Sequence, residues 1–359
     1  MKTVGFTAIL LLLLILNLDC SSSIYRDVYP TLIDGRYDSE FPYRRSSDQL
    51  QQIAESVKRI SVLAHYRWYF FKRSDQVLLS MINTDFLQQH KQNLQYTNPS
   101  TSGTALVVYS RDSKIALLTC AHIISFPDSV VSYYLDEHQK RTEHIRSIAF
   151  KEEQLIYLSD IGGGTPLQIL ANDPIHDLAI IGNRLDRGFA LNILPFPYPM
   201  GRARELEWGS FVYLFGYPHG YKMITKGIVS NPKGRLDGTF YVDAVLAQGS
   251  SGGITLAIRD GVPNFELVGL VKLVPAQNYY VLTPPKTLEN AEYDPVELYK
   301  GDIVVEQRTD IQYGIVQIIS SERIVDFLES NREQLLRRGF NLDSFAAPRQ
   351  IPSDTLKAR

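Results

Sequence analysis

Apolar residues from about residue 60 to about residue 320 fall into short runs of the kind that form β-strands. The runs are rich in β-branched and aromatic residues and are separated by Gly, Pro, Asn and Asp, which are typical of turns. They read ISVLAHYRWYFF, TALVVY, IALLT, VVSYYL, LAIIG, FVYLFG, TFYVDAVL, GITLAI, ELVGLV and YGIVQI. Many short strands with little helix between them predict an all-β sandwich or barrel.

Helical spacing occurs only near the two ends of this strand-rich region. The stretch SSDQLQQIAESVKRI predicts a short N-terminal helix, in which the apolar residues at helical spacing are Leu50, Ile53, Val57 and Ile60. The stretch SERIVDFLESNREQLLRR predicts a C-terminal helix, whose apolar face consists of Ile324, Phe327, Leu328, Leu335 and Leu336. Glu322 near its start and Arg337 near its end match the helix dipole.

Two segments interrupt the strand pattern. Residues 75–98 are polar and partly helical in spacing, which predicts a surface insertion, and residues 283–311 predict a long loop. We therefore assign one domain to residues 47–338, preceded by a linker or arm at 21–46 and followed by a polar tail at 339–359.

The first twenty residues have the pattern of an export signal. One lysine precedes an apolar run that is short for a membrane-spanning helix, so residues 1–20 are expected to direct export to the periplasm or cell envelope. Cys20 follows this run and precedes three serines, as in a bacterial lipoprotein signal, although Asp19 stands where a small residue is preferred. Lipidation of Cys20, an ordinary signal peptide and an uncleaved anchor are the three alternatives.

Composition narrows the functional classes. The 359 residues carry a net charge of −2, which gives no electrostatic basis for binding nucleic acid. The only cysteines are Cys20 and Cys120, so loss or lipidation of Cys20 leaves no intrachain disulfide. Cys120 is then expected to be a small buried apolar residue. No motif indicates a metal or an organic cofactor.

The candidate chemistry lies in the stretch DAVLAQGSSGGI, where GSSGG is either a flexible linker or a turn that presents Ser251. A serine nucleophile needs a base and a group that orients the base. His122 ends the apolar strand IALLTCA, and Asp177 begins the strand LAIIG, with separations of 55 and 74 residues along the chain in the order His, Asp, Ser. Taken singly, each residue also has an ordinary structural explanation: a surface histidine, a residue that starts a strand, and a linker.

These segments resemble the motifs of trypsin-like serine proteases, and the HtrA/Deg branch is the most similar. LLTCAHII resembles the histidine motif, HDLAII the aspartate motif and GSSGG the serine motif. TSGTALVV, FVYLFGYPHGY, TKGIVSNPKGR and YGIVQIISSERIVDFLE resemble further HtrA segments in the expected order. The resemblance implies two six-stranded β-barrels with the catalytic residues between them, a short N-terminal helix and a C-terminal helix.

The resemblance also implies roles for individual residues. Ser251 would be the nucleophile, His122 the general base and Asp177 the residue that orients His122. The backbone N–H groups of Gly249 and Ser251 would form the oxyanion hole, because glycine can adopt the backbone conformation that this turn needs. Val245, six positions before Ser251, would form the floor of the substrate pocket, which predicts cleavage after small or medium apolar residues.

Some features depart from the family. The residues that follow the expected C-terminal helix are too few to form the PDZ module that HtrA proteins usually carry, so none is expected here, and Ser250 replaces a common asparagine. The resemblance suggests a homotrimer, for which the aromatic stretch HYRWYFF is a candidate contact. Other histidines are expected to be spectators; they are His65, His176 and His219.

Three functions remain open at this point. The first is an exported serine endopeptidase that acts on proteins or peptides in quality control or processing. The second is a surface-exposed binding protein with a protease fold and weak or no activity. The third, a hydrolase that uses Cys120, lacks a separate base and orienting residue.

Overall fold

The computed structural model describes residues 34–42, 45–138, 140–159, 166–185, 193–234, 237–273, 276–284, 301–311 and 314–347. The expected export signal at 1–20, including Cys20, and the first part of the linker lie outside these ranges. None of the described helices is long and apolar enough to cross a membrane.

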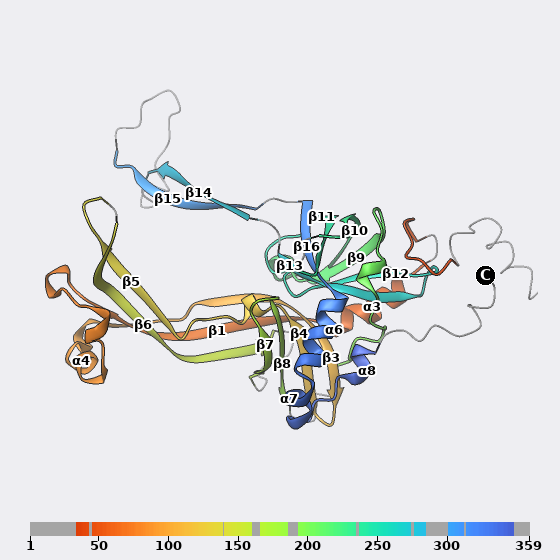
Figure 1. The fold of residues 1–359 in the computed structure, drawn as a ribbon, viewed down its shortest axis with the longest axis horizontal. Helices are drawn as coiled ribbons and strands as arrows, with labels where there is room; N and C mark the ends of the chain where they lie inside the picture. The colour runs from red at the N-terminus through yellow and green to blue at the C-terminus, as the bar shows by residue number, and fades with distance from the viewer. Residues whose placement is uncertain are drawn as a thin grey trace, which may run out of the picture.

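The first half of the fold is a large antiparallel sheet that follows helix α3 (Ser47–Ser56). Its strands are β1 (Val57–Phe70), β2 (Leu94–Thr97), β3 (Ser100–Arg111), β4 (Lys114–Thr119), β5 (Ser129–Leu135), β6 (Arg141–Leu158), β7 (Gln168–Asp173) and β8 (Leu178–Arg184). They pair in the order β5-β6-β1-β3-β4-β8-β7, and β2 pairs with β1. The distal parts of β1 and β6 extend with β5 into a projection, here called the β-extension (Figure 1).

The second half is a closed six-stranded barrel, β10-β11-β16-β13-β12-β9. Its strands are β9 (Phe211–Gly216), β10 (Met223–Asn231), β11 (Thr239–Ala244), β12 (Ile254–Ile258), β13 (Phe265–Leu273) and β16 (Gly314–Ser320). The predicted all-β, two-barrel fold is confirmed. Its first half differs in detail, because the described strands form an eight-stranded half-barrel in place of a six-stranded closed one.

A shared apolar core joins the two halves. It contains Leu118 and Ile180 from the first sheet and Leu256 and Leu267 from the barrel. Side chains alternate along a strand, so Ala257, next to Leu256, belongs to the separate cluster inside the barrel. Both faces of β12 are therefore buried, which explains why its sequence, ITLAI, is apolar without alternation.

The C-terminal helices cover the junction. They are α6 (Ser321–Ser330), α7 (Arg332–Arg337) and α8 (Asp343–Ala346). Helix α6 packs on β13 and β16, and α7 contacts β7 of the first half (Figure 1). The predicted apolar face is confirmed, with four members buried, although Leu336 is partly exposed.

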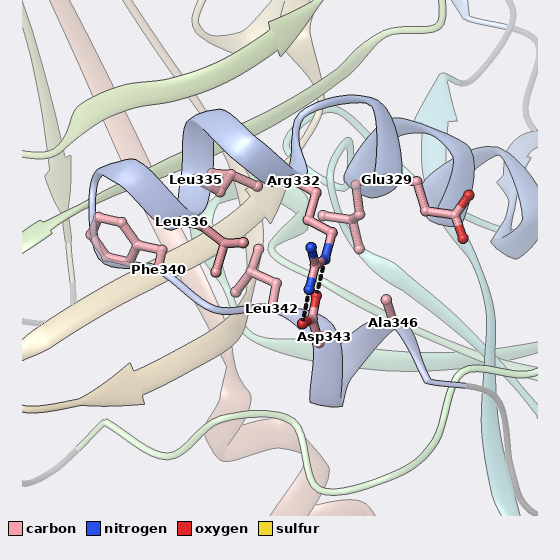
Figure 2. Close-up of a pocket in the computed structure, with 9 residues that line it drawn as sticks. Glu329, Arg332, Leu335, Leu336, Phe340, Leu342, Asp343 and Ala346 are labelled. Atoms are coloured by element: carbon pink, nitrogen blue, oxygen red, sulfur yellow. Dashed lines mark hydrogen bonds and ion pairs between the residues drawn. The ribbon is translucent and has the colours of Figure 1, made fainter.

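Residues 339–347 do not behave as a polar tail. Phe340, Leu342 and Phe345 are buried. Figure 2 shows how α8 folds back toward α7, with a two-bond contact of 2.8 and 2.6 Å between the Arg332 guanidinium and the Asp343 carboxylate. The compact end of the domain therefore includes α8.

The two insertions differ in how well the sequence predicts them. The first, at 75–98, is confirmed as partly helical: it contains α4 (Thr84–Gln89) and the short 3-10 helices η3 (Leu79–Met81) and η4 (Lys91–Asn93), and η2 (Arg73–Asp75) ends at its first residue. In the second, the predicted loop is wrong for residues 304–311, because β15 (Val304–Ile311) pairs antiparallel with β14 (Ala276–Thr283). Apolar cross-strand pairs such as Leu282 and Val305 favour this ribbon.

Aromatic residues of HYRWYFF contribute to local packing in the β-extension. Tyr66, Tyr69 and Phe71 are buried, and Phe71 contacts Phe86 of α4 with ring centroids 5.8 Å apart. Three of its five aromatic side chains are thus buried within the chain, and the use of this stretch as a trimer contact stays a prediction.

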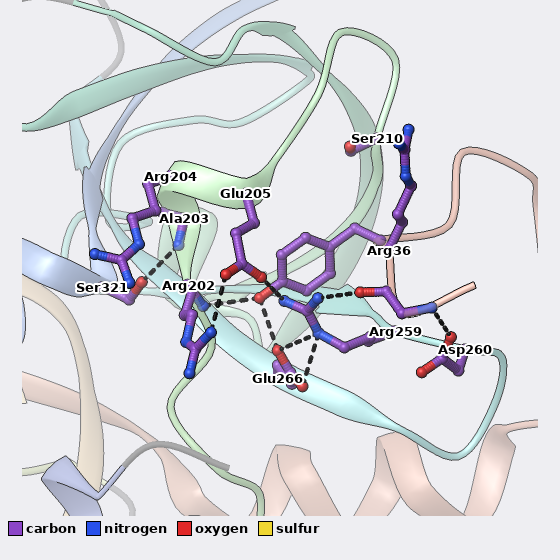
Figure 3. Close-up of polar contacts among 12 residues, drawn as sticks. Arg36, Arg202, Ala203, Arg204, Glu205, Ser210, Arg259, Asp260, Glu266 and Ser321 are labelled. Carbon is purple, nitrogen blue, oxygen red and sulfur yellow. Dashed lines mark hydrogen bonds and ion pairs between the residues drawn. The ribbon is translucent and has the colours of Figure 1, made fainter. Parts of the chain in front are cut away.

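Residues 34–42 lie against the second barrel as an arm (Figure 3). The Tyr37 hydroxyl donates to Glu266 at 2.7 Å and accepts from the Arg202 N–H at 2.8 Å. Arg259 contacts the carboxylates of both Glu266, at 3.2 Å, and Glu205, at 2.8 Å. Glu266 and Arg259 are both buried, and a buried charge is costly unless an opposite charge pairs with it. The contact between these two side chains supplies that pairing.

Docking of this arm is expected to weaken as pH rises. Burial raises the pKa of Asp38 from 3.8 to about 7. The Gly261 N–H, which donates a hydrogen bond to Asp38, lowers this pKa, whereas the nearby carboxylates add to the rise; they are Asp260, Glu40 and Asp34. The docked arm therefore holds this proton more tightly than the released arm. Docking is strongest at acid pH and is lost progressively as pH passes from about 4 through 7.

Asp38→Asn should remove this dependence. Hydrogen-exchange protection factors for residues 34–42 should fall between pH 5 and pH 8 in the parent and stay level in the variant. An equal fall in both proteins would show that another group controls docking.

Candidate active site

The sheet register brings the predicted histidine and aspartate together. His122 lies in the 3-10 turn η5 (Ala121–Ile123), directly after β4, and Asp177 lies in the turn before β8. Strands β4 and β8 are antiparallel neighbours with Thr119 opposite Ala179. The end of one strand is therefore beside the start of the other, so residues far apart in sequence meet.

His122 and Asp177 form a tight pair. The Asp177 carboxylate lies 2.8 and 3.0 Å from Nδ1 of His122, and its Oδ1 also accepts the His122 backbone N–H at 2.8 Å. Asp177 has a positive φ of 61°, a conformation that aspartate tolerates better than most residues. Its side chain is 11% exposed, against 41% for His122. A carboxylate acceptor at Nδ1 favours the tautomer with a free lone pair on Nε2.

The GSSGG stretch is a packed turn and not a flexible linker. Ser250 N–H donates to Ala247 at 3.1 Å, and Gly253 N–H donates to Ser250 at 2.9 Å. Gly252 has a φ of +79°, and a Cβ on it would overlap the carbonyl oxygen of Thr104. Close packing on neighbouring backbone thus explains the glycine at this position.

The position of Ser251 follows from its neighbours. Gly252 N–H and the Cys120 thiol both bond to the carbonyl of Val271, at 2.8 and 3.2 Å. The serine segment and the segment that carries His122 therefore lie side by side. No hydrogen bond joins Ser251 Oγ to the His122 ring in the described part of the chain; such bonds are often long before substrate binds.

Two backbone donors remain free beside Ser251. Within the described residues, the N–H groups of Gly249 and Ser251 have no hydrogen-bond acceptor. The Gln248 carbonyl accepts the His219 N–H at 2.9 Å. Since C=O and N–H point in opposite directions across a trans peptide, the Gly249 N–H points away from the 217–220 turn. Such donors can stabilise an oxyanion.

The predicted pocket floor, Val245, is 73% exposed in this structure, and its role in the substrate pocket stays a prediction. Strand β11 ends at Ala244, and Val245 projects outward at the start of the loop, while Leu246 is the buried residue.

One group of side chains in the described residues could bring metal-ligating atoms together. It consists of Cys120, His122 and Asp177, whose ligand atoms lie within 4.8 Å of one another. Burial raises the pKa of the Cys120 thiol well above its ordinary value, and Asp177 adds to the effect. The thiol is therefore protonated and is a poor metal ligand or nucleophile. A metal would also have to displace the His122–Asp177 contact.

The other histidines have separate partners. His176 Nδ1 contacts Asp173 at 2.7 Å, and His65 Nδ1 contacts Asn98 at 2.8 Å. His219 contributes its backbone N–H to the serine turn, a role that side-chain motifs cannot reveal. The sequence does not mark Thr104 either, although it lies within the TSGTALVV motif.

Residues 103–270 match the family model described as trypsin-like peptidase domain. This part of the chain is therefore similar to trypsin-like peptidase domains. His122, Asp177 and Ser251 all lie within the matched residues. Among solved structures, a mutant of the tobacco etch virus protease matches with 13% identity and a TM-score of 0.34, covering 85% of this chain and 89% of that one. No curated protein sequence matches the chain.

Proposed function

We propose that this chain is a serine-type endopeptidase. The Ser251 hydroxyl attacks the carbonyl carbon of a peptide bond while His122 Nε2 takes its proton. The resulting oxyanion accepts hydrogen bonds from the N–H groups of Gly249 and Ser251. His122 then protonates the leaving amine, and water hydrolyses the acyl-enzyme by the same steps in reverse.

The observation that carries this proposal is the His122–Asp177 pair. The carboxylate is buried and contacts both Nδ1 and the backbone N–H of His122, so the ring has a fixed orientation. This is what a general base requires, since the charge formed on the imidazole is stabilised where it arises. The pair lies in a peptidase domain, beside a serine turn with free donors.

A fluorophosphonate probe tests the proposal directly. The intact protein should be labelled covalently, and Ser251→Ala should not be labelled, whereas Ser250→Ala should retain the label. Labelling that persists in Ser251→Ala would exclude this nucleophile. A folded protein that is never labelled would favour a binding protein on a protease fold.

We expect cleavage after small or medium apolar residues. The segment AVLAQ before the serine turn and the strand GIVQII carry no carboxylate that could pair with a lysine or arginine of the substrate. An unpaired buried ammonium is costly, whereas one methylene more or less changes binding by only about 1–3 kcal/mol. A mass-spectrometric map of cleavage sites in denatured protein measures this preference, and cutting mainly at charged residues would contradict it.

We also propose an HtrA-like role for the exported enzyme in protein quality control or processing. This role is supported by the sequence motifs around the three site residues and by the N-terminal sequence, which has the pattern of an export signal. Substrates would then be unfolded or partly folded proteins in the cell envelope.

Cys20→Ala should release the mature protein from the membrane fraction, because lipidation at Cys20 would supply the acyl chains that anchor it. Fractionation and the mass of the mature N-terminus measure the effect. Identical partitioning of parent and variant, with a mature chain that starts elsewhere, would rule out lipidation and leave export open.

A further inference from the structure

Thr104 connects the two halves of the fold at the serine turn. It lies on β3 in the first half, opposite Arg59 of β1, and is fully buried. Its backbone N–H donates to the Ser251 carbonyl at 2.8 Å, and its own carbonyl accepts from the Thr119 hydroxyl at 2.7 Å. A residue of the first half thus holds the backbone of the candidate nucleophile in the second.

The Thr104 hydroxyl has a complete set of partners. It donates to the Gly249 carbonyl at 2.8 Å and accepts the Tyr217 N–H at 2.9 Å. One hydroxyl therefore bonds the serine turn and the turn that follows β9. These are the same two turns that the His219 to Gln248 bond joins.

These bonds fix the peptide units on both sides of Gly249. His219 holds the carbonyl of the preceding unit, and Thr104 holds the carbonyl of Gly249 itself. Gly249 has a φ of +99°, and a glycine can rotate its peptides more freely than other residues. Rotation away from the observed arrangement would leave the buried Thr104 hydroxyl without its acceptor, which is unfavourable.

We infer that Thr104 is a positioning residue for the oxyanion hole, which it holds in the geometry that accepts the oxyanion. The inference rests on the proposed serine-protease function. Thr104 acts through Gly249 and contacts neither the base nor the substrate. Its loss should therefore affect stabilisation of the transition state more than substrate binding or the ionisation of His122.

The test compares Thr104→Val, which removes the hydroxyl at nearly constant volume, with Thr104→Ser, which retains it. On a peptide substrate, kcat per active site should fall roughly 10- to 100-fold in Thr104→Val, because the Gly249 carbonyl loses its buried hydrogen bond, with KM nearly unchanged. Affinity for a peptide boronate, whose tetrahedral adduct occupies the hole, should fall by a similar factor. Thr104→Ser should recover most of both, and the pH profile should keep its shape.

Thr255→Val is the matched control. Thr255 is fully buried in β12, and its hydroxyl has no partner in the described residues, so this change should leave kcat and boronate affinity at parental values. Parental kcat in Thr104→Val, or equal losses in Thr104→Val and Thr104→Ser, would overturn the inference. If Thr104→Val does not fold, Thr104→Ala takes its place. On the folded fraction, kcat should then be lower in Thr104→Ala than in Thr104→Ser, and equal values would overturn the inference. Failure of the proposed function is distinguishable, because the parent itself would then show no turnover.

Discussion

Replacing Ser251 with alanine is expected to abolish proteolysis while leaving the fold intact. The change removes the hydroxyl of the proposed nucleophile, beside the free N–H groups of Gly249 and Ser251, so no acyl-enzyme can form. Loss of a triad nucleophile typically lowers kcat by about 10⁶-fold. Casein hydrolysis measures the activity, and circular dichroism with a melting curve checks the fold.

His122→Ala should be nearly as inactive, and the double variant should be little worse than either single one. This follows because the nucleophile and its base act in one step, so removing the second adds almost nothing. Strictly additive losses would mean that the two residues work independently. Activity of Ser251→Ala close to that of the parent would exclude the proposed mechanism.

The positions of His122 and Asp177 could be predicted because His122 follows the apolar strand β4 and Asp177 directly precedes the apolar strand β8. Ser251 is marked by the glycine–serine cluster before β12. The pairing of β4 with β8 then brings His122 and Asp177 together. The predicted roles of all three residues still await experiment. Glycines of the serine motif were also informative, since close packing against neighbouring backbone leaves no room for a side chain at Gly249 or Gly252.

Other features depend on contacts between distant segments, which a single sequence does not display. Thr104 looks like any polar residue at a strand, and only the packing of the two halves gives its hydroxyl two partners. Docking of the arm through Tyr37 requires Glu266, which is more than two hundred positions away. The exposure of Val245 likewise depends on where β11 ends, which the sequence pattern does not mark.

Gly249→Ala is expected to lower kcat by about 10²- to 10³-fold, the usual effect of losing one oxyanion donor. Gly249 has a φ of +99°, and a Cβ on it would overlap the carbonyl oxygen of Tyr217, so the peptide that carries the Gly249 N–H must move. The Ser251 hydroxyl and His122 would stay in place, so fluorophosphonate labelling should continue, only more slowly.

Gly209→Ala separates this effect from the general cost of replacing a glycine. Gly209 has a similar φ of +84°, but nothing lies within 4 Å of the position its Cβ would take. The two variants therefore share the backbone strain, about 1–2 kcal/mol for a residue with a side chain, and differ in the collision at the serine turn. Gly209→Ala should lose some thermal stability and keep parental kcat, measured per labelled active site. Equal kcat in the two variants would show that the Gly249 N–H does not stabilise the oxyanion, and that Ser251 works with a different donor.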